Sequence, residues 1–166
     1  MMPFREMRRF RQQLSREECE AVLRRGTSGV LAVTGDGGWP YAVPLSYAYK
    51  EGKLLFHCAK EGHKLDALRR DGRASFCVID QDLVIPEKYT TAYRSVIAFG
   101  TVRILEDGAE LREAAEVLGR RYYPGGTAEE LEAEVSGAMA RLRALEMTVE
   151  HMTGKEAREL MEERNK

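Results

Sequence analysis

The sequence predicts an α+β fold in which short antiparallel strands close around one core as a barrel and helices flank it. Apolar and polar residues alternate with a period of two through much of residues 29–105, with turn sequences between the alternating segments. After residue 105 the apolar residues recur with helical spacing. Hairpins that precede helices in this way are typical of α+β proteins rather than of doubly wound parallel sheets. Many short antiparallel strands around one core favour a barrel.

The first predicted elements are a helix and a hairpin. Ser15 and Glu18 form a capping box and Gly26 is suited to end the helix, so we expect a helix over residues 15–25. A β-rich segment follows, then the turn Gly-Asp-Gly-Gly, and then an alternating segment over residues 39–49. These features predict a hairpin of two strands, at residues 29–34 and 39–49.

The second strand of this hairpin has two unlike faces. Its small residues leave room for a flat ligand, and Pro40 and Pro44 cannot donate ladder hydrogen bonds, so the strand lies at an edge or contains a bulge. The alternative is an edge strand that is only protected from aggregation. One face consists of Tyr41, Val43, Leu45, Tyr47 and Tyr49, and the other of Ala42, Pro44, Ser46 and Ala48.

The middle of the chain continues with strands and one helix. A turn at residues 50–53 leads to a strand at 53–58, and a helix follows at about 62–70. Strands are predicted at 73–79 and 93–105, the latter with a bend at Gly100. The connection from Asp80 to Ala92 is long enough to be a flap or a dimer-contact segment, or alternatively a disordered surface loop.

The last third of the chain is mainly helical. Apolar stripes predict two amphipathic helices, at residues 111–122 and 131–142, which we expect to pack on the sheet. Pro124-Gly-Gly126 separates them, and Thr127 and Glu130 form a second capping box. Residues 143–152 are predicted as a closing strand, followed by a short helix capped by Thr153 and Glu156.

Composition limits the classes of function. The 166 residues contain no linker and no long uncharged apolar run, so we expect one domain over 1–166, in the cytoplasm, with no membrane partner. The N-terminus lacks the apolar segment of a secretory signal. A net charge of −1 gives no reason to expect nucleic acid. Cys19, Cys58 and Cys77 have no CxxC spacing and are expected to be reduced thiols, and no acidic or histidine grouping predicts a metal.

The segment from Leu54 to Leu68 is the most informative part of the chain. A strand there runs through a polar turn directly into a helix, whose first N–H groups have no intrahelical partner and lie at the positive end of the helix dipole. Lys60, His63 and Lys64 add cationic or donor groups. No P-loop or GxGxxG pattern accompanies them. We therefore predict a phosphate site for a mononucleotide cofactor.

Five segments in order resemble a known family. They are Trp39-Pro-Tyr-Ala-Val-Pro-Leu-Ser-Tyr47, Phe56-His-Cys-Ala-Lys-Glu-Gly-His-Lys64, Ala74-Ser-Phe-Cys-Val78, Tyr93-Arg-Ser-Val-Ile-Ala-Phe-Gly-Thr101 and His151-Met-Thr-Gly-Lys155. The chain is similar over nearly its whole length to the nitroimidazole-resistance (Nim-like) branch of the pyridoxamine 5'-phosphate oxidase-like, FMN-binding split-barrel proteins. The resemblance implies an antiparallel split β-barrel and a homodimer with two FMN molecules at the subunit interface, each touched by both chains.

The resemblance also implies the cofactor-binding residues. Next to the isoalloxazine ring it places Val43, Pro44, Leu45 and Ser46, and beside them His57, Cys58 and Ala59. The phosphate would be bound by Lys60, His63 and Lys64, although His63 stands where relatives often have arginine, which weakens its assignment. From the partner chain would come Arg94 and Ser95, which point to opposite faces of an ideal strand. We favour Arg94, because a cation near the flavin stabilises the reduced anionic form.

Two classes of function follow from the resemblance. The first is an FMN-dependent oxidoreductase that reduces a small electron-poor substrate, such as a nitro-aromatic 5-nitroimidazole, with His57 as proton donor or substrate contact. Without the resemblance, a histidine at a strand end is a structural residue. The second class is a flavin-binding carrier or sensor without turnover. Pyridoxamine-phosphate oxidation is less favoured, because no second basic cluster is evident, and the missing nicotinamide fingerprint indicates an external electron donor.

Overall fold

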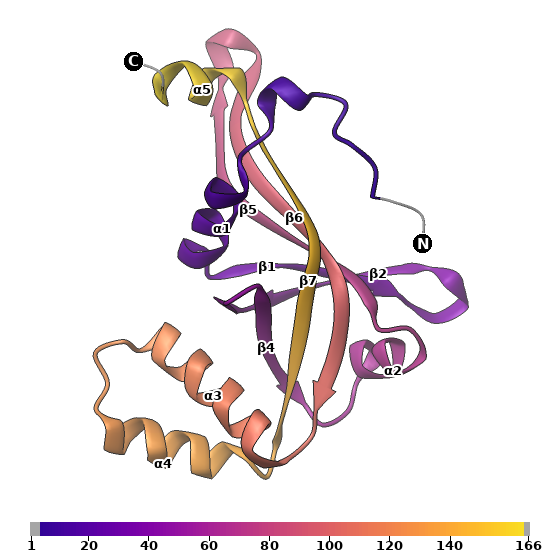
Figure 1. The fold of residues 1–166 in the computed structure, drawn as a ribbon, viewed down its shortest axis with the longest axis vertical. Coiled ribbons are helices and arrows are strands. Elements are labelled where there is room, and N and C mark those ends of the chain that lie inside the picture. Colours follow the sequence, from indigo (N-terminus) through magenta and orange to yellow (C-terminus); the bar gives the residue numbers. More distant parts are fainter. Residues whose placement is uncertain (1–3, 165–166) are drawn as a thin grey trace.

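A computed structural model describes residues 4–164 of the chain. Its strands form one antiparallel sheet in the order β2-β1-β5-β6-β7-β4-β3, and Figure 1 shows how this sheet coils around the core. The strands are β1 Ser28–Thr34, β2 Pro40–Ser46, β3 Ala48–Lys50, β4 Lys53–Ala59, β5 Arg73–Ile85, β6 Thr90–Leu105 and β7 Leu142–Glu156. The helices are α1 Arg16–Arg25, α2 His63–Arg70, α3 Gly108–Tyr122, α4 Ala128–Ala138 and α5 Arg158–Arg164. The predicted α+β class with a split barrel is confirmed.

The core lies inside the coiled sheet. Leu31, Phe56, Phe76 and Leu145 come from four different strands and are fully buried there. Helix α1 packs on this core with Cys19, Val22 and Leu23. A second, smaller core under α3 includes Leu105, Leu111 and Ala144. Burial of these side chains is the main stabilising term for the fold.

Helix α1 confirms the predicted capping box. The Ser15 hydroxyl accepts from the Glu18 N–H at 3.2 Å, and the Glu18 carboxylate accepts from the Ser15 N–H at 2.7 Å. Two of the helix's otherwise unpaired donors are satisfied in this way. The Thr127 and Glu130 box at the start of α4 is confirmed as well.

The single strand predicted over residues 39–49 is wrong. The structure divides it at Tyr47 into β2 and β3, which lie at opposite edges of the sheet. The backbone N–H of Tyr47 donates to the Tyr122 hydroxyl at 2.8 Å, and the Tyr47 hydroxyl donates to the Leu23 carbonyl at 2.7 Å. Because α1 and α3 hold Tyr47 between the two edges, the chain crosses from one edge to the other there. The predicted edge position of the proline-containing segment is confirmed for β2.

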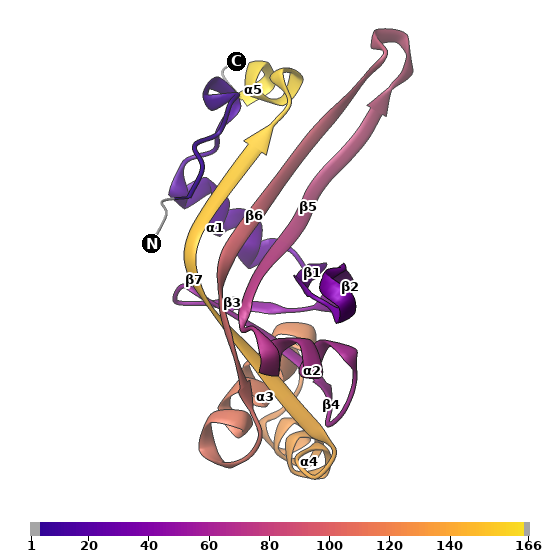
Figure 2. The same cartoon turned by 90° about the vertical axis from the view of Figure 1, so that its right-hand side faces the viewer.

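The connection predicted over residues 80–92 is a hairpin rather than an irregular segment, and its role as a flap or dimer contact stays a prediction. Strands β5 and β6 continue to Ile85 and from Thr90 as one antiparallel hairpin, with a short turn at Pro86–Lys88. Figure 2 shows this hairpin extending beyond the rest of the sheet as an arm. Asp80 is an extra residue at the base of the arm, because the register shifts between Ile79 and Gln81. The strand therefore continues beyond Ile79, where the predicted strand ends, but the extra residue reverses which positions of β5 point to each face of the sheet.

The remaining differences concern the last third of the chain. Helix α3 packs on the sheet as predicted, whereas α4 lies mainly against α3. The closing strand β7 extends to Glu156, so Thr153 and Glu156 belong to the strand and do not cap α5.

Within residues 4–164, no helix is both long and apolar enough to cross a membrane.

Gly100 confirms the predicted bend. The register of β6 against β7 shifts between Phe99 and Gly100. A Cβ at Gly100 would lie 1.9 Å from the Thr148 carbonyl oxygen, so only glycine allows the two strands to approach so closely there.

Candidate functional site

Two strand edges approach each other without forming a ladder. Strand β2 pairs with β1 along Pro40–Ser46, and β4 pairs with β7 along its length but with β3 only as far as Leu55. Among the described residues, no strand pairs with the other edge of β2 or with the corresponding edge of β4 at residues 56–59. We call these two facing edges the split. Their backbone N–H and C=O groups are available to a ligand.

The side chains along the split alternate as the sequence predicts. On β2, Val43 and Leu45 turn toward the core and are partly buried, whereas Pro44 and Ser46 are exposed. On β4, Cys58 packs on the core, whereas His57 and Ala59 are exposed. The exposed residues leave the edges accessible, and the inward residues fix the two strands to the core.

Helix α2 begins directly beyond the end of β4. Gly62 precedes it with φ 144°, a conformation that favours glycine, and no side chain caps the helix. The first N–H groups of α2 therefore remain free to bind an anion, at the positive end of the helix dipole. Lys60, His63 and Lys64 lie around this terminus, as predicted, and Lys64 is the most buried of the three.

The basic side chains at this corner differ in their partners. The His63 ring stacks on Tyr41, with ring centroids 4.0 Å apart, and its Nε2 lies 3.8 Å from Asp36. Lys60, Lys64 and Arg143 make no ion pair with any described residue. Cations without carboxylates next to a free helix terminus fit a phosphate.

The pKa of the Cys58 thiol is affected by the positive charges near the start of α2. Burial raises the pKa of this thiol, and the positive charges of Lys64, Arg143 and Arg69 oppose that rise. Because burial outweighs the cations, Cys58 stays a neutral thiol at pH 7 and packs as a small apolar residue. The three cations nevertheless lie near enough to its sulfur to affect its ionisation.

Sequence reasoning missed Arg143. Arg143 is the second residue of β7 and lies directly opposite Cys58 in the β4–β7 ladder. Its Nε is buried without a hydrogen-bond partner, and its Nη1 donates only to the Leu142 carbonyl, at 3.1 Å. Cys58 and Arg143 are 85 positions apart in the sequence, so only strand pairing brings them together, and no local signal indicates it.

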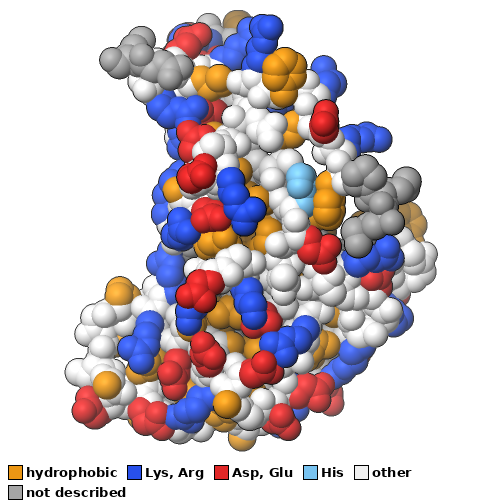
Figure 3. Space-filling view, viewed as in Figure 1, with side chains coloured by type: hydrophobic (Ala, Val, Ile, Leu, Met, Phe, Trp, Pro, Cys, Tyr) orange, Lys and Arg blue, Asp and Glu red, His pale blue; other side chains and the backbone are white. Residues whose placement is uncertain are grey.

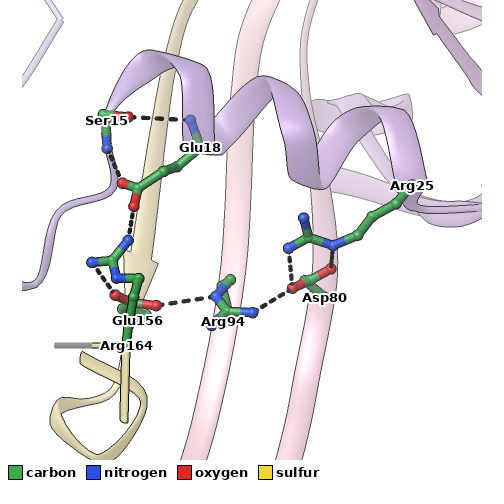
Figure 4. Close-up of polar contacts among 7 residues, drawn as sticks. All are labelled: Ser15, Glu18, Arg25, Asp80, Arg94, Glu156 and Arg164. Carbon is green, nitrogen blue, oxygen red and sulfur yellow. Dashed lines mark hydrogen bonds and ion pairs between the residues drawn. The ribbon is translucent and has the colours of Figure 1, made fainter. Parts of the chain in front are cut away.

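Arg94 belongs to a chain of ion pairs (Figure 4). Its guanidinium donates to Glu156 at 3.1 Å and to Asp80 at 3.0 Å. Asp80 also accepts from Arg25 at 2.6 Å, and Arg164 lies 2.6 Å from Glu156 and also pairs with Glu18. The Glu156 side chain is only 1% exposed, and burying a carboxylate without such cationic partners is costly.

Ser95 faces the other side of the sheet. It stands opposite Ile79 on β5 and Lys155 on β7. Strands β1 and β5 separate β6 from β2, a distance of roughly 14 Å at the usual strand spacing. On the other side, Arg94 and Ser95 pair with the last residues of β7, whereas β4 pairs with residues 142–148 at the other end of that strand. Arg94 and Ser95 therefore do not join the split of their own chain, and which of them meets a ligand stays a prediction.

Five strands share a face that no helix of the described chain covers. We call it the open face, and its apolar members include Val30 (38% exposed), Ile79 (66%) and Ile97 (38%). Phe4 stacks on His151 there with centroids 4.6 Å apart, beside a hollow of about 820 Å³. The open face consists of Ala42, Pro44, Ser46, Val30, Ala32, Ser75, Cys77, Ile79, Ser95, Ile97, Phe99, His151, Thr153 and Lys155.

Figure 3 shows where the charged side chains lie. Acidic and basic side chains cover α3 and α4 in the lower part of the view and continue along its left side, whereas fewer lie in the middle of the view beside the N-terminal segment. An apolar sheet surface in a chain with 32% charged residues is a candidate contact surface.

Comparisons with known proteins agree with this geometry. The profile of the family described as pyridoxamine 5'-phosphate oxidase matches residues 15–156. A search of curated proteins found no match.

Solved structures share the fold. A protein of Bacteroides thetaiotaomicron described as a candidate 5-nitroimidazole antibiotic resistance protein is 22% identical, with a TM-score of 0.72 over 86% of this chain and 85% of that one. A conserved hypothetical protein of Mycobacterium tuberculosis is 24% identical, with a TM-score of 0.75 over 89% and 88%. A protein of Mesorhizobium loti described as FAD-binding is 26% identical, with a TM-score of 0.59 over 87% and 96%.

Proposed function

Because the chain belongs to the pyridoxamine 5'-phosphate oxidase family, we propose that it binds FMN at the split and reduces a small electron-poor substrate such as a nitro-aromatic compound. One observation carries this proposal. The unpaired edges of β2 and β4 converge on the uncapped start of α2, where Lys60 and Lys64 have no acidic partner among the described residues. A flat ring system with polar edges and a phosphate tail matches such an arrangement.

Each part of the site has a distinct role in this proposal. Backbone groups of Val43–Ser46 and of His57–Ala59 bind the polar edge of the ring, and Lys60 and Lys64 bind the phosphate with the N–H groups of α2. The bound flavin supplies the electrons that reduce the substrate. His57 is exposed at the end of β4 and is placed to donate a proton to the substrate or to contact it.

The substrate class rests on the similarity to the Bacteroides protein described as a nitroimidazole resistance protein. The similarity to a protein described as FAD-binding makes the choice between FMN and FAD the first point to test. The corner at α2 supports the mononucleotide, because its unpaired cations lie within one turn of the helix terminus.

The experiment is the visible spectrum of freshly purified protein, followed by chromatography of the released cofactor. We expect a flavin spectrum with FMN as the released species, bleaching with dithionite in the absence of oxygen, and reoxidation by an added nitroimidazole. Bound flavin that the nitro compound does not reoxidise would indicate a carrier or sensor. Reduction of the oxidised flavin by pyridoxamine phosphate, followed by reoxidation with oxygen, would indicate an oxidase. A colourless protein that FMN and FAD fail to reconstitute would overturn the proposal.

Lys64→Ala tests the phosphate site. We expect FMN affinity to fall roughly 10-fold or more, because a charge-assisted hydrogen bond to phosphate is lost. Fluorescence titration of the apoprotein measures the affinity. The control is Lys50→Ala, since Lys50 on β3 makes an exposed ion pair with Glu113 on α3. Unchanged affinity in Lys64→Ala would place the phosphate elsewhere.

We also propose that the functional form is a homodimer whose subunits meet through the open face. That face is broad and apolar, and Arg94 and Ser95 are too far from the split of their own chain to complete it. A two-fold related copy can bring the same strand to the split of its partner. In this arrangement Ser95 lies on the contact surface, whereas Arg94 remains in its ion pairs.

Ile97→Glu tests the dimer. A buried, unpaired carboxylate at the centre of the contact disfavours association, so sedimentation is expected to show a monomer with weakened FMN binding. The control is Ala133→Glu, which adds the same charge on an exposed side of α4. A flavin-bound wild-type monomer would contradict the shared site.

A further inference from the structure

We propose that Arg143 binds the phosphate of the cofactor together with Lys64. The inference rests on the proposed flavin function and extends it to a residue of β7. It follows from the position of Arg143, from its missing partners and from the partners that His63 already has.

The β4–β7 ladder positions Arg143. Directly paired residues of antiparallel strands point to the same face, so Arg143 shares the face of Cys58, at the end of β4 that leads into α2. Lys64 lies in the first turn of α2, and this helix begins only four residues after Ala59, the last residue of β4. A phosphate bound at the start of α2 is therefore within reach of both cations.

Among the arginines of the described chain, Arg143 is distinguished by a buried Nε that has no hydrogen-bond partner. Arg25 and Arg94 pair with Asp80, and Arg103 pairs with Glu110 and Glu146. Arg143 pairs with no carboxylate among residues 4–164, and its buried Nε has no acceptor. A buried donor without an acceptor is costly, and a phosphate presents oxygens that a guanidinium can bind through two parallel bonds.

His63 is less suited to this role. Its ring stacks on Tyr41, and its Nε2 lies 3.8 Å from the Asp36 carboxylate. The same carboxylate accepts a hydrogen bond from Arg70 at 2.7 Å. A neutral imidazole donates only one hydrogen bond. Arg143 is thus the guanidinium placed to act with Lys64.

The test compares FMN with riboflavin, which has the same ring without the phosphate. For Arg143→Gln we expect FMN affinity to fall roughly 10- to 100-fold, as for other hydrogen bonds to charged groups, with riboflavin affinity unchanged. Arg143→Lys keeps the charge but not the paired donors, so its loss should be smaller. Arg141→Gln is the matched control, because Arg141 is an exposed neighbour that donates to the Gly137 carbonyl.

A second measurement needs no variant. Phenylglyoxal modifies arginine side chains, and mass spectrometry locates the modified residue. We expect FMN, but not riboflavin, to protect Arg143 in the wild-type protein. Equal loss of FMN and riboflavin affinity, an unchanged FMN affinity, or protection by both ligands would overturn the inference while leaving the flavin function intact. Failure of the wild type to bind either ligand would overturn the proposed function itself.

Discussion

Adjacent residues of the split differ in what they can do because they face opposite sides of one strand. His57 is exposed, whereas Cys58 packs on the core with a raised thiol pKa. The alternation is readable from the sequence, so the contrast between these two residues is predictable. The surroundings of Arg94 and Arg143 cannot be predicted in this way. Strand pairing places Glu156 beside Arg94 and Cys58 beside Arg143, and local sequence does not encode that pairing.

His57→Ala tests the exposed histidine near the end of β4. If His57 donates a proton to the substrate, we expect reduction of the nitro compound to slow roughly 10²- to 10⁴-fold, with FMN still bound. Stopped-flow reoxidation of the dithionite-reduced protein measures the rate, and the flavin absorbance confirms occupancy. Equal rates in the variant and the wild type would remove His57 from the chemistry.

At the scale of single elements, local sequence was a good guide where the determinants lie within a few residues. Both capping boxes and the helix α2 appear where predicted. The arm of β5 and β6 was missed, because the bulge at Asp80 interrupts the alternation. Leu83 and Val84 face opposite sides of the arm and both are exposed, so the arm has no apolar face to produce a period of two. The ladder of the arm pairs residues of β5 with residues of β6, and the apolar pattern of one strand does not predict which strand it pairs with.

Ser15→Ala tests the cap of α1. Loss of the bond from the Glu18 N–H is expected to lower the free energy of unfolding by about 1 kcal/mol. Chemical denaturation followed by circular dichroism measures the change. Ser15→Asp is the control, because its carboxylate can accept the same bond and should keep stability within a few tenths of a kcal/mol of the wild type. An unaltered Ser15→Ala midpoint would mean that the cap contributes nothing to global stability.

At the level of the whole molecule, the chain of ion pairs in Figure 4 connects elements that are far apart in the sequence. It links α1 through Arg25, the base of the arm through Asp80, β6 through Arg94, and the end of β7 through Glu156. Burial alone would raise the pKa of Asp80, but hydrogen bonds from Arg25 and Arg94 outweigh it and lower that pKa. Folding therefore favours the ionised form of this carboxyl group.

The lowered pKa of Asp80 predicts acid sensitivity. Its contribution to stability is fully present above the unfolded pKa of about 3.9 and is lost as the pH falls through the lower folded value. Asp80→Asn should thus be less stable than the wild type by about 2 kcal/mol at pH 7, with the difference shrinking below pH 4. Urea denaturation across this range measures it.

The control for this prediction is Asp82→Asn. Asp82 is an exposed neighbour on the arm and pairs with no cation among the described residues, so its substitution should leave the pH profile unchanged. A gap between Asp80→Asn and the wild type that stays constant from pH 7 to pH 2 would contradict the role assigned to Asp80.

Local sequence was enough to predict the starts of α1 and α2, the capping box of α4, the turns after β1 and β3, the edge position of β2 and the basic junction at Lys60–Lys64, because neighbouring residues set each of these features. Only the tertiary structure decided that the segment around Tyr47 separates into two opposite edges of the sheet and so creates the split. It also decided that Arg94 is paired and Arg143 is not. The physical reason is that these outcomes depend on contacts between residues far apart in the chain, which no local periodicity encodes.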